Sequence, residues 1–127
     1  MSAPPIEMTS PMALWQQQLE TGRLMVQQCT GCVRHVFYPR VLCPHCGSQS
    51  LAWKDAAGTG TVYSTTVVSR RESDGGPYNV ALVDLDEGVR MMSRVEDVSP
   101  DTVVIGQRVT AFIGRIDERA VVLFRPA

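Results

Sequence analysis

Apolar and polar positions follow a helical spacing near the start of the chain. The apolar residues recur in a segment that is otherwise rich in glutamine; they are Met12, Leu14, Trp15 and Leu19. Ser10 can cap a helix, Pro11 is favoured at the first helical position, and Gly22 can end it. The pattern predicts a helix over residues 11–21. A helix this short is not stable alone, so its apolar stripe must pack on this domain or on a partner.

Short apolar stretches on either side of two cysteine pairs predict a small ribbon of strands. The stretches are residues 24–28, 36–38 and 51–54. Residues 55–60 are rich in turn-forming glycine and mark a boundary. Residues 1–9 contain proline and serine without periodicity, so we expect a loose arm before the helix.

After position 60 the pattern changes to an alternation typical of β-strands. It predicts five strands, at residues 61–70, 78–85, 89–95, 108–116 and 120–124. The second and third are separated by a short turn and should form a hairpin. Five short strands with one longer central connection suit a small barrel such as an OB-fold, and the periodicity alone fits a sandwich almost as well.

Composition and charge narrow the classes of function. The chain has 127 residues, 44% of them hydrophobic, which is enough for a buried core. Its formal net charge is −1, whereas nucleic-acid-binding domains normally carry a strong basic excess. No apolar run approaches the ~20 residues that span a bilayer. The first residues do not resemble a signal peptide, so we expect no membrane association and a cytoplasmic protein.

Four cysteines carry the clearest chemical signal. Cys29 and Cys32 form one Cys-x2-Cys pair, and Cys43 and Cys46 form another after ten intervening residues. Each pair can form a tight turn, or knuckle, whose amides point at the sulfurs, and two knuckles make a tetrahedral four-sulfur site. Four thiolates leave no open position on the metal. The spacing therefore predicts one structural Zn²⁺ ion.

Two disulfides, a redox dithiol and an iron centre are the alternative uses of the four cysteines. Two disulfides would need an oxidising compartment, and a redox dithiol would need a βαβ unit. Iron is the alternative metal, because rubredoxin uses the same ligand pattern. His35 and His45 are interpreted as surface residues. Val33 follows the first knuckle where glycine would be easier, so we expect that knuckle to be looser or slightly strained.

Metal binding should supply most of the ribbon's folding energy. The ribbon has few apolar residues and cannot build its own core. Metal binding to such peptides contributes on the order of 10 kcal/mol. The ribbon should therefore depend on its metal.

The ordered set of motifs resembles the zinc-ribbon OB-fold proteins associated with acyl-CoA enzymes, once known only as a domain of unknown function. The departures are Val33, where the family usually has glycine, and Tyr38, where a second proline is common. The motifs include Gln28-Cys29-Thr30-Gly31-Cys32, Phe37-Tyr38-Pro39-Arg40, Cys43-Pro44-His45-Cys46-Gly47, Gly58-Thr59-Gly60-Thr61-Val62-Tyr63-Ser64, Asp84-Leu85-Asp86-Glu87-Gly88 and Phe124-Arg125-Pro126.

The resemblance implies a mainly β chain: an N-terminal helix, a rubredoxin-like zinc ribbon and a five-stranded OB-fold barrel. We assign residues 1–22 to the arm and helix, 23–57 to the ribbon and 58–127 to the OB-fold. It also implies an accessory subunit of a thiolase-like enzyme, in a heterotetramer that shares its acyl-CoA substrate. The pathways implied are degradation of steroid, aromatic or fatty acyl compounds.

A non-catalytic role agrees with the residues themselves. No Ser-His-Asp set, paired carboxylates or open metal site can be identified in the sequence. Candidate contacts to coenzyme A or to the partner are Arg70 and Arg71 beside a glycine-rich loop, with Tyr78, Arg40 and Trp15. All five residues could equally be ordinary surface or packing residues.

The two alternative functions are nucleic-acid binding and independent catalysis. Single-stranded nucleic-acid binding is a common use of zinc ribbons and OB-folds, but it needs a basic groove with stacking aromatics. Aromatic residues make up only 6% of this chain. An independent enzyme would need catalytic groups that the sequence does not offer.

Overall fold

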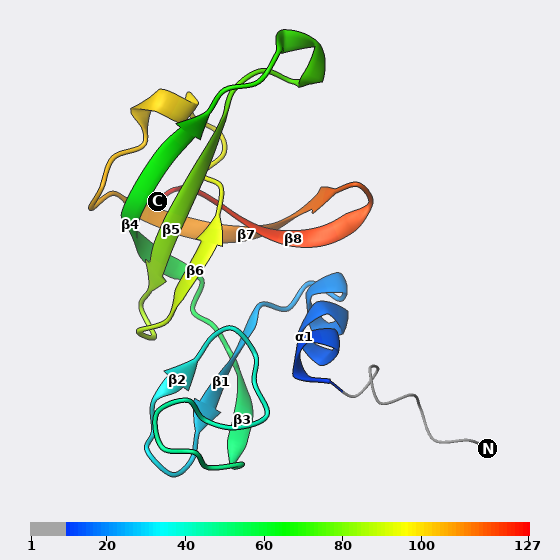
Figure 1. Cartoon of the computed structure of the whole chain (residues 1–127), viewed down its shortest axis with the longest axis vertical. Coiled ribbons are helices and arrows are strands. Elements are labelled where there is room, and N and C mark those ends of the chain that lie inside the picture. Colours follow the sequence, from blue (N-terminus) through cyan, green and yellow to red (C-terminus); the bar gives the residue numbers. More distant parts are fainter. Residues whose placement is uncertain (1–9) are drawn as a thin grey trace, which may run out of the picture. The chain divides into compact units, whose positions relative to one another are not determined.

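The computed structural model describes residues 10–127, so the predicted arm at residues 1–9 lies outside the described part. The chain divides into two compact units. The first contains the chain up to Ala56 together with Arg115–Val121, and the second contains Ala57–Gly114 and Val122–Ala127. Each unit is described by itself (Figure 1). The three-part division at residues 22 and 57 stays a prediction.

The helix α1 spans Pro11–Glu20, close to its predicted range. The Ser10 hydroxyl accepts a hydrogen bond from the Ala13 N–H at 3.2 Å, which satisfies one of the free amides of the first turn. Leu19 is fully buried, and the Trp15 ring meets the Phe37 ring edge-on at 5.5 Å. Trp15 and Leu19 of the apolar stripe therefore pack within their own unit, while Met12 is 44% exposed.

Three short antiparallel strands form the ribbon sheet, in the order β2-β1-β3. They are β1 (Met25–Cys29), β2 (His35–Val36) and β3 (Leu51–Asp55). The central residue Gln27 pairs with Val36 on one side and Trp53 on the other. The buried Gln27 amide also donates to the Arg40 carbonyl at 2.8 Å and accepts from the Arg40 N–H at 2.7 Å. A polar core residue thus fixes the loop that leads to the second cysteine pair.

The tip of the hairpin formed by β7 (Arg108–Ile116) and β8 (Arg119–Pro126) belongs to the first unit and contacts the helix. The Ala120 N–H donates to the Glu20 carboxylate, and Gln16 donates to the Ala120 carbonyl, both at 2.9 Å. Arg115 donates to the other Glu20 oxygen at 2.9 Å. The side chains of Glu20 and Gln16 therefore satisfy the backbone N–H and C=O of Ala120, which lies on the edge strand β8.

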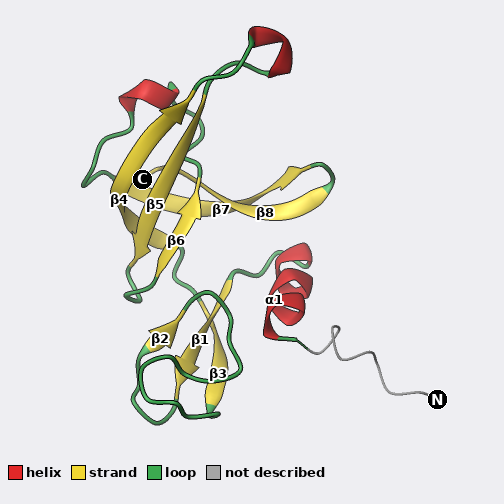
Figure 2. Cartoon of the chain, in the orientation of Figure 1, coloured by secondary structure: helices red, strands yellow, loops and turns green. Residues whose placement is uncertain are grey.

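The second unit contains a five-stranded antiparallel sheet in the order β6-β5-β4-β7-β8. Figure 2 shows β4 and β5 running side by side, with the short helix η2 at the end of the loop that joins them. The elements are β4 (Thr59–Val68), η2 (Glu72–Asp74), β5 (Tyr78–Leu85), β6 (Arg90–Ser93), η3 (Pro100–Thr102), β7 (Arg108–Ile116) and β8 (Arg119–Pro126).

The sheet curls at β4, which carries a bulge and comes very close to β5 at Gly60. Its pairing with β5 shifts register between Val62 and Ser64. Gly60 lies so close to β5 that an added Cβ would come within 2.6 Å of the Asp84 carbonyl oxygen. A parallel bridge from Val95 to Phe124 then links the two ends of the curled sheet. A sandwich would need two stacked sheets, so this half-barrel confirms the OB-fold prediction.

Inward-facing apolar residues fill the second unit. Along β5, every second residue is buried, as the alternation in the sequence predicts. The buried residues Val62, Val83, Leu85, Val109 and Phe124 come from four different strands. The curled sheet therefore encloses one core of its own.

Candidate metal centre

The first knuckle is a turn closed by backbone hydrogen bonds. The Cys29 N–H donates to the Arg34 carbonyl at 2.9 Å, and the Val33 N–H donates to the Cys29 carbonyl at 2.8 Å. Val33 adopts the left-handed conformation, with φ of 69°. This conformation is unfavourable for a β-branched residue, so the strain expected at Val33 has a structural basis.

The second knuckle repeats these bonds at the equivalent positions. The Cys43 N–H donates to the Ser48 carbonyl, and the Gly47 N–H donates to the Cys43 carbonyl, both at 2.8 Å. Gly47 has φ of 78° and occupies the place that Val33 holds in the first knuckle. Glycine adopts this conformation without a steric penalty. The two knuckles thus share one backbone geometry and differ in the residue that must bear it.

The four thiols converge on one point. Their sulfur atoms all lie within 4.8 Å of one another. The Cys29 and Cys46 sulfurs are 3.5 Å apart, and those of Cys32 and Cys43 are 3.7 Å apart. A tetrahedral metal with metal–sulfur bonds of ~2.3 Å requires sulfur separations of about 3.8 Å. These two separations are close to the tetrahedral value, and no other pair of the four sulfurs is more than 4.8 Å apart, so the cluster suits a four-coordinate metal ion.

Backbone amides favour the thiolate form of the two buried cysteines. The Cys32 N–H, 3.5 Å from the Cys29 sulfur, is the main cause that lowers the pKa of Cys29 to about 6. Burial raises the pKa of Cys43, but the amides of Cys46 and His45 outweigh it, and the net pKa is lowered. Metal ligation requires thiolates, so the amides of the knuckles favour the form of Cys29 and Cys43 that can bind a cation.

Cys46 has a different environment. The Ser48 amide lowers its pKa, but the adjacent Cys29 thiol, desolvation and the two other thiols together raise it to about 11. In the absence of metal, one cluster of four thiols cannot ionise fully at neutral pH, because each thiolate opposes the next. A bound cation would remove that opposition.

The cysteine cluster is the only such group among the described residues. Within residues 10–127, no other set of three or more His, Cys, Asp or Glu side chains could hold a metal ion. The predicted surface position of His45 agrees with its exposure; its Nδ1 lies 3.4 Å from the Arg34 guanidinium. A four-sulfur cluster of this kind is suited to a structural metal and leaves no position for substrate.

Two of the predicted contact residues, Arg70 and Tyr78, lie together in the second unit. The Arg70 guanidinium lies 4.7 Å from the centre of the Tyr78 ring, and its Nε donates to the Gly76 carbonyl at 2.6 Å. Arg94, which sequence reasoning missed, lies 4.3 Å from the same ring centre. The predicted hairpin could have revealed it, because antiparallel pairing places the end of β6 beside the start of β5.

Arg71 lies at the start of η2 and is exposed. Among the described residues, no ion pair involves Arg70, Arg71 or Arg94. The buried Asn79 holds this region in place, since its Oδ1 accepts from the Val95 N–H at 3.1 Å. Arg70 and Arg94 therefore share one tyrosine ring, and neither they nor Arg71 have a carboxylate of the described part within ion-pair distance.

The other two predicted contact residues, Trp15 and Arg40, lie in the first unit. Trp15 is half-buried, and its indole N–H donates to the Met25 carbonyl at 2.9 Å. The Arg40 side chain is exposed, while its backbone is held by Gln27. Trp15 therefore packs within its own unit, which is one of the two outcomes expected for the helix stripe, while its hydrogen bond to Met25 was not predicted.

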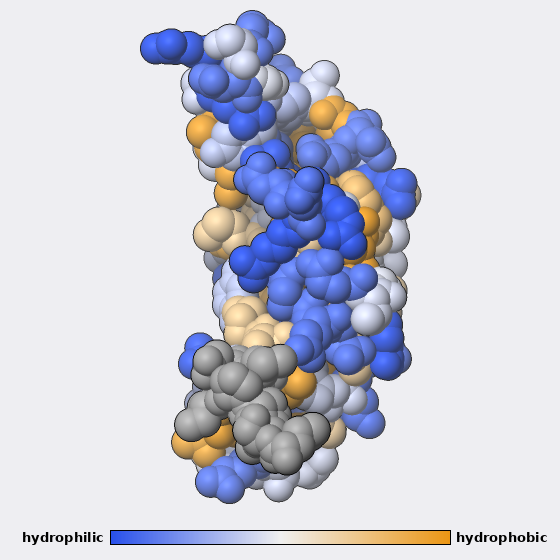
Figure 3. All heavy atoms as spheres, turned by 90° about the vertical axis from the view of Figure 1, so that its right-hand side faces the viewer, coloured by the Kyte–Doolittle hydropathy of each residue, from blue (hydrophilic) through white to orange (hydrophobic). Residues whose placement is uncertain are grey.

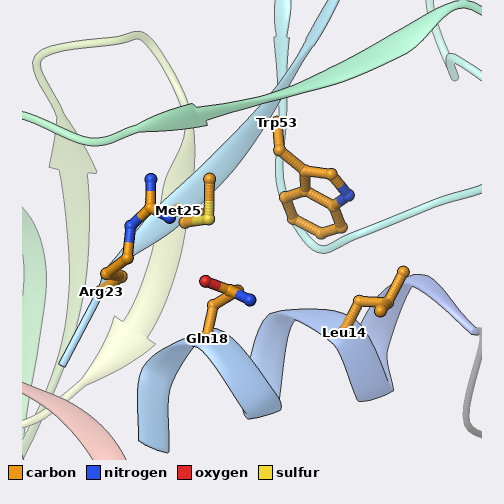
Figure 4. A pocket seen from close by; sticks show the side chains of 5 residues that line it. All are labelled: Leu14, Gln18, Arg23, Met25 and Trp53. Carbon is orange, nitrogen blue, oxygen red and sulfur yellow. The ribbon is translucent and has the colours of Figure 1, made fainter. Parts of the chain in front are cut away.

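A groove between α1 and the ribbon sheet was also not predicted. It has a volume of about 250 Å³. Figure 4 shows Trp53 pointing from β3 toward the helix, and Leu14 and Gln18 pointing toward the sheet. Arg23 at its rim is held by both oxygens of Asp55, at 3.0 and 2.9 Å, and this bond lowers the pKa of Asp55.

Exposed apolar side chains occur in both units. On the face shown in Figure 3, most residues are hydrophilic and the hydrophobic ones form several separate groups. The largest exposed fractions are those of Ile105 at 70%, Val41 at 66% and Val33 at 64%. In residues 10–127, no helix has the length and apolar character needed to cross a membrane.

Comparison with known domains gives two adjacent matches. Residues 17–52 match the rubredoxin-like zinc ribbon domain of ChsH2, and residues 53–113 match the C-terminal OB-fold domain of ChsH2. These matches agree with the fold class predicted from the sequence and with the architecture described above.

Several curated proteins are similar in sequence. A probable enoyl-CoA hydratase alpha subunit of Thermomonospora curvata is 36% identical over 91% of this chain; the chain spans 37% of that relative's length. A DUF35 domain-containing scaffold protein of Methanothermobacter thermautotrophicus is 31% identical, over 87% of this chain and 86% of its own. A scaffold protein of the same description from Pyrococcus furiosus is 32% identical, over 87% and 85% of the two chains.

Two solved structures share the fold. A chain of the structure described as "Ltp2-ChsH2(DUF35) aldolase" is 36% identical, with a TM-score of 0.79 over 90% of this chain and 92% of that one. A DUF35 protein of unknown function from Sulfolobus solfataricus is 16% identical, with a TM-score of 0.65 over 90% of this chain and 83% of that one. At that identity, the second match supports the fold alone.

Proposed function

The chain belongs to the ChsH2 (DUF35) family, and we propose that it is a non-catalytic accessory subunit of an enzyme that acts on acyl-CoA. We assign the partner to the thiolase superfamily, as a thiolase or an aldolase-like relative, in a cytoplasmic heterotetramer. Its substrates would be steroid, aromatic or fatty acyl thioesters. The chain would stabilise the partner and help to enclose the substrate.

The observation that carries this proposal is the match to a chain of the Ltp2-ChsH2(DUF35) aldolase, which extends over nine-tenths of both chains. A fold alone says little about function, but this match also retains 36% sequence identity. The name "scaffold protein" of the archaeal relatives points to the same kind of role. The closed four-sulfur cluster is consistent with a subunit that performs no chemistry itself.

We assign Cys29, Cys32, Cys43 and Cys46 as the ligands of one structural Zn²⁺ ion. Their sulfur separations of 3.5 and 3.7 Å support tetrahedral coordination. Zinc is chosen over iron because the matching domain is a zinc ribbon. The ion would hold the two knuckles together and so replace the core that the ribbon lacks.

For the substrate, we propose that Arg70, Arg71 and Tyr78 contact a phosphate group of coenzyme A, together with Arg94. Arg70 and Arg94 both stack on the Tyr78 ring and have no carboxylate partner in the described part. Guanidinium groups bind phosphate oxygens through paired hydrogen bonds. Arg40 and Trp15 remain positions to test for contact with the partner.

Copurification from the native host tests the proposed partnership. An affinity-tagged chain should enrich a thiolase-superfamily subunit, identified by mass spectrometry, and the purified complex should act on acyl-CoA where the chain alone does not. A Cys43→Ser chain serves as the control, because it should lose its metal and its ordered ribbon. Recovery of no acyl-CoA enzyme by the intact chain would contradict the proposal.

The coenzyme A contact has its own test in that complex. Arg94→Ala and Arg70→Ala should each weaken coenzyme A binding roughly tenfold, the loss expected for one charge-assisted contact. Lys54→Ala removes an exposed charge from the ribbon and should leave binding unchanged. Equal affinities for all three variants would remove these arginines from the substrate site without affecting the partnership.

Within residues 10–127, the aromatic rings of the second unit do not favour the nucleic-acid alternative. Tyr63, Tyr78 and Phe112 each have at least one of the protein's own arginines over the ring. Base stacking on single strands needs open aromatic faces beside a basic groove. The accessory role therefore stands as the proposed function.

A further inference from the structure

The four cysteines of the cluster differ sharply in exposure. Cys29 and Cys43 are buried, with 0% and 2% of their surface exposed. Cys32 is half-buried and packs against the small core that these two form with Val36. Cys46 is exposed. Since Cys32 and Cys46 hold equivalent positions in the two knuckles, the difference comes from what covers each knuckle.

Backbone amides contact the sulfur atoms of both knuckles. The Cys29 sulfur faces the Cys32 N–H at 3.5 Å, and the Cys43 sulfur faces the His45 N–H at 3.4 Å. The Ser48 amide acts on Cys46 in the same way, so exposure and not amide contact sets Cys46 apart. The Cys46 sulfur lies 3.5 Å from the Cys29 sulfur. The exposed cysteine of the cluster therefore has a second, buried cysteine directly behind it.

We propose that Cys46 is the site at which electrophiles and peroxides enter the metal centre, and that its modification releases the metal. This inference rests on the zinc ligation proposed above, but not on the accessory role. A zinc-bound cysteine is a thiolate, and reactivity toward electrophiles follows thiolate character and exposure. Of the four ligands, Cys46 alone combines both properties.

The chemistry can be written as balanced steps. With a maleimide, a lone pair on the Cys46 sulfur forms a bond to one alkene carbon, and water supplies a proton to the other. The resulting thioether carries no charge and no longer holds zinc. With hydrogen peroxide, the Cys46 thiolate takes one oxygen and hydroxide leaves; the Cys29 thiolate then attacks that sulfur, forming a disulfide and expelling a second hydroxide. Two electrons leave the thiolates, and peroxide plus two protons becomes two water molecules.

The experiment uses the full chain, with its zinc content measured first. A limiting amount of N-ethylmaleimide is added, released zinc is followed with a chromogenic chelator, and the modified cysteine is identified by peptide mass spectrometry. We expect Cys46 to react first, with one zinc released for each Cys46 modified. With peroxide, the first disulfide should join Cys29 and Cys46.

Two matched variants isolate the exposed position. Cys46→His and Cys32→His both replace one thiolate by imidazole and keep four zinc ligands. Rapid zinc release should be lost in Cys46→His and retained in Cys32→His. First modification at any other cysteine, or equal release rates in the two variants, would overturn the inference. A wild-type chain purified without any bound metal would instead contradict the zinc ligation itself.

Discussion

Because Val33 adopts a left-handed conformation, substitution by glycine should give a more stable protein than substitution by alanine, which is the reverse of the usual order. At an ordinary position, glycine is less stable than alanine by roughly 0.5–1 kcal/mol, because it loses more backbone entropy on folding. A residue with a Cβ in the left-handed region costs roughly 1–2 kcal/mol. Since φ of Val33 is 69°, Val33→Gly should be more stable than Val33→Ala by about 0.5–1 kcal/mol.

Both substitutions remove the same valine methyl groups, so the comparison cancels any lost packing. Val41 is the matched control: it lies in the same ribbon, with 66% exposure against 64% for Val33, and it is not among the residues with positive φ. At Val41, glycine should be less stable than alanine. The pair of comparisons therefore differs only in backbone conformation.

Competition with a chromogenic zinc chelator is a suitable assay, because the energy of folding the ribbon appears in its metal affinity. The expected difference corresponds to a roughly twofold to fivefold tighter zinc affinity for Val33→Gly than for Val33→Ala. The same rank order at both positions, with alanine better in each, would refute the strain assigned to the first knuckle.

Three further predictions concern the metal, the core and acid stability. Cys43→Ser should abolish stoichiometric zinc binding and the ordered ribbon, measured by elemental analysis and amide exchange. Asn79→Ala leaves the buried Val95 N–H without its acceptor and should lower the free energy of unfolding by roughly 1–3 kcal/mol in urea titrations. Arg108 lowers the pKa of Asp86 to about 2, so ionised Asp86 stabilises the folded state above its unfolded pKa, and this stability is lost as pH falls through about 2. Asp86→Asn should therefore lose stability at neutral pH and show a weaker decline toward pH 3.

Each of these predictions has a control and an outcome that would count against it. His45→Ser lies in the same knuckle as Cys43 and should keep the metal; loss in both variants would point to general damage. Gln17→Ala removes an amide side chain at an exposed position and should leave the free energy of unfolding nearly unchanged; an equal loss in Asn79→Ala and Gln17→Ala would count against the buried hydrogen bond. Asp101→Asn removes the same charge at an exposed position. If its stability depended on pH in the same way as that of Asp86→Asn, the ion pair of Asp86 with Arg108 would not explain the acid sensitivity.

Periodic patterns in the sequence located nearly every element, because each depends on local geometry. The helix was predicted at residues 11–21 and spans Pro11–Glu20. The strand predicted at residues 61–70 spans Thr59–Val68, two residues earlier at each end. The strand β2 was predicted at residues 36–38 and spans only His35–Val36, so the predicted and observed strands share one residue. Such short strands carry too little periodicity for their ends to be read from sequence.

Residues that act through long-range contacts could not be assigned in the same way. Trp15 was a candidate contact residue, but its indole N–H bonds to Met25 in the neighbouring strand. Arg94 was missed, although the predicted hairpin places it near Tyr78, because its stacking on that ring also depends on the exact register of the hairpin. In each case the chemistry of the side chain was visible, while its partner depended on how the strands pair.

The sequence by itself determined the spacing of the four cysteines, the order of the helix and strands, and the family. These properties are local or additive along the chain, so they can be predicted without knowing the tertiary structure. The knuckle motif also indicated strain at Val33, which the left-handed conformation of that residue explains. Only the tertiary structure decided that the sheet curls into a half-barrel rather than a sandwich, and that Cys46 is the exposed cysteine of the cluster. Curvature and exposure depend on which surfaces meet across the fold, and residues adjacent in sequence do not reveal that.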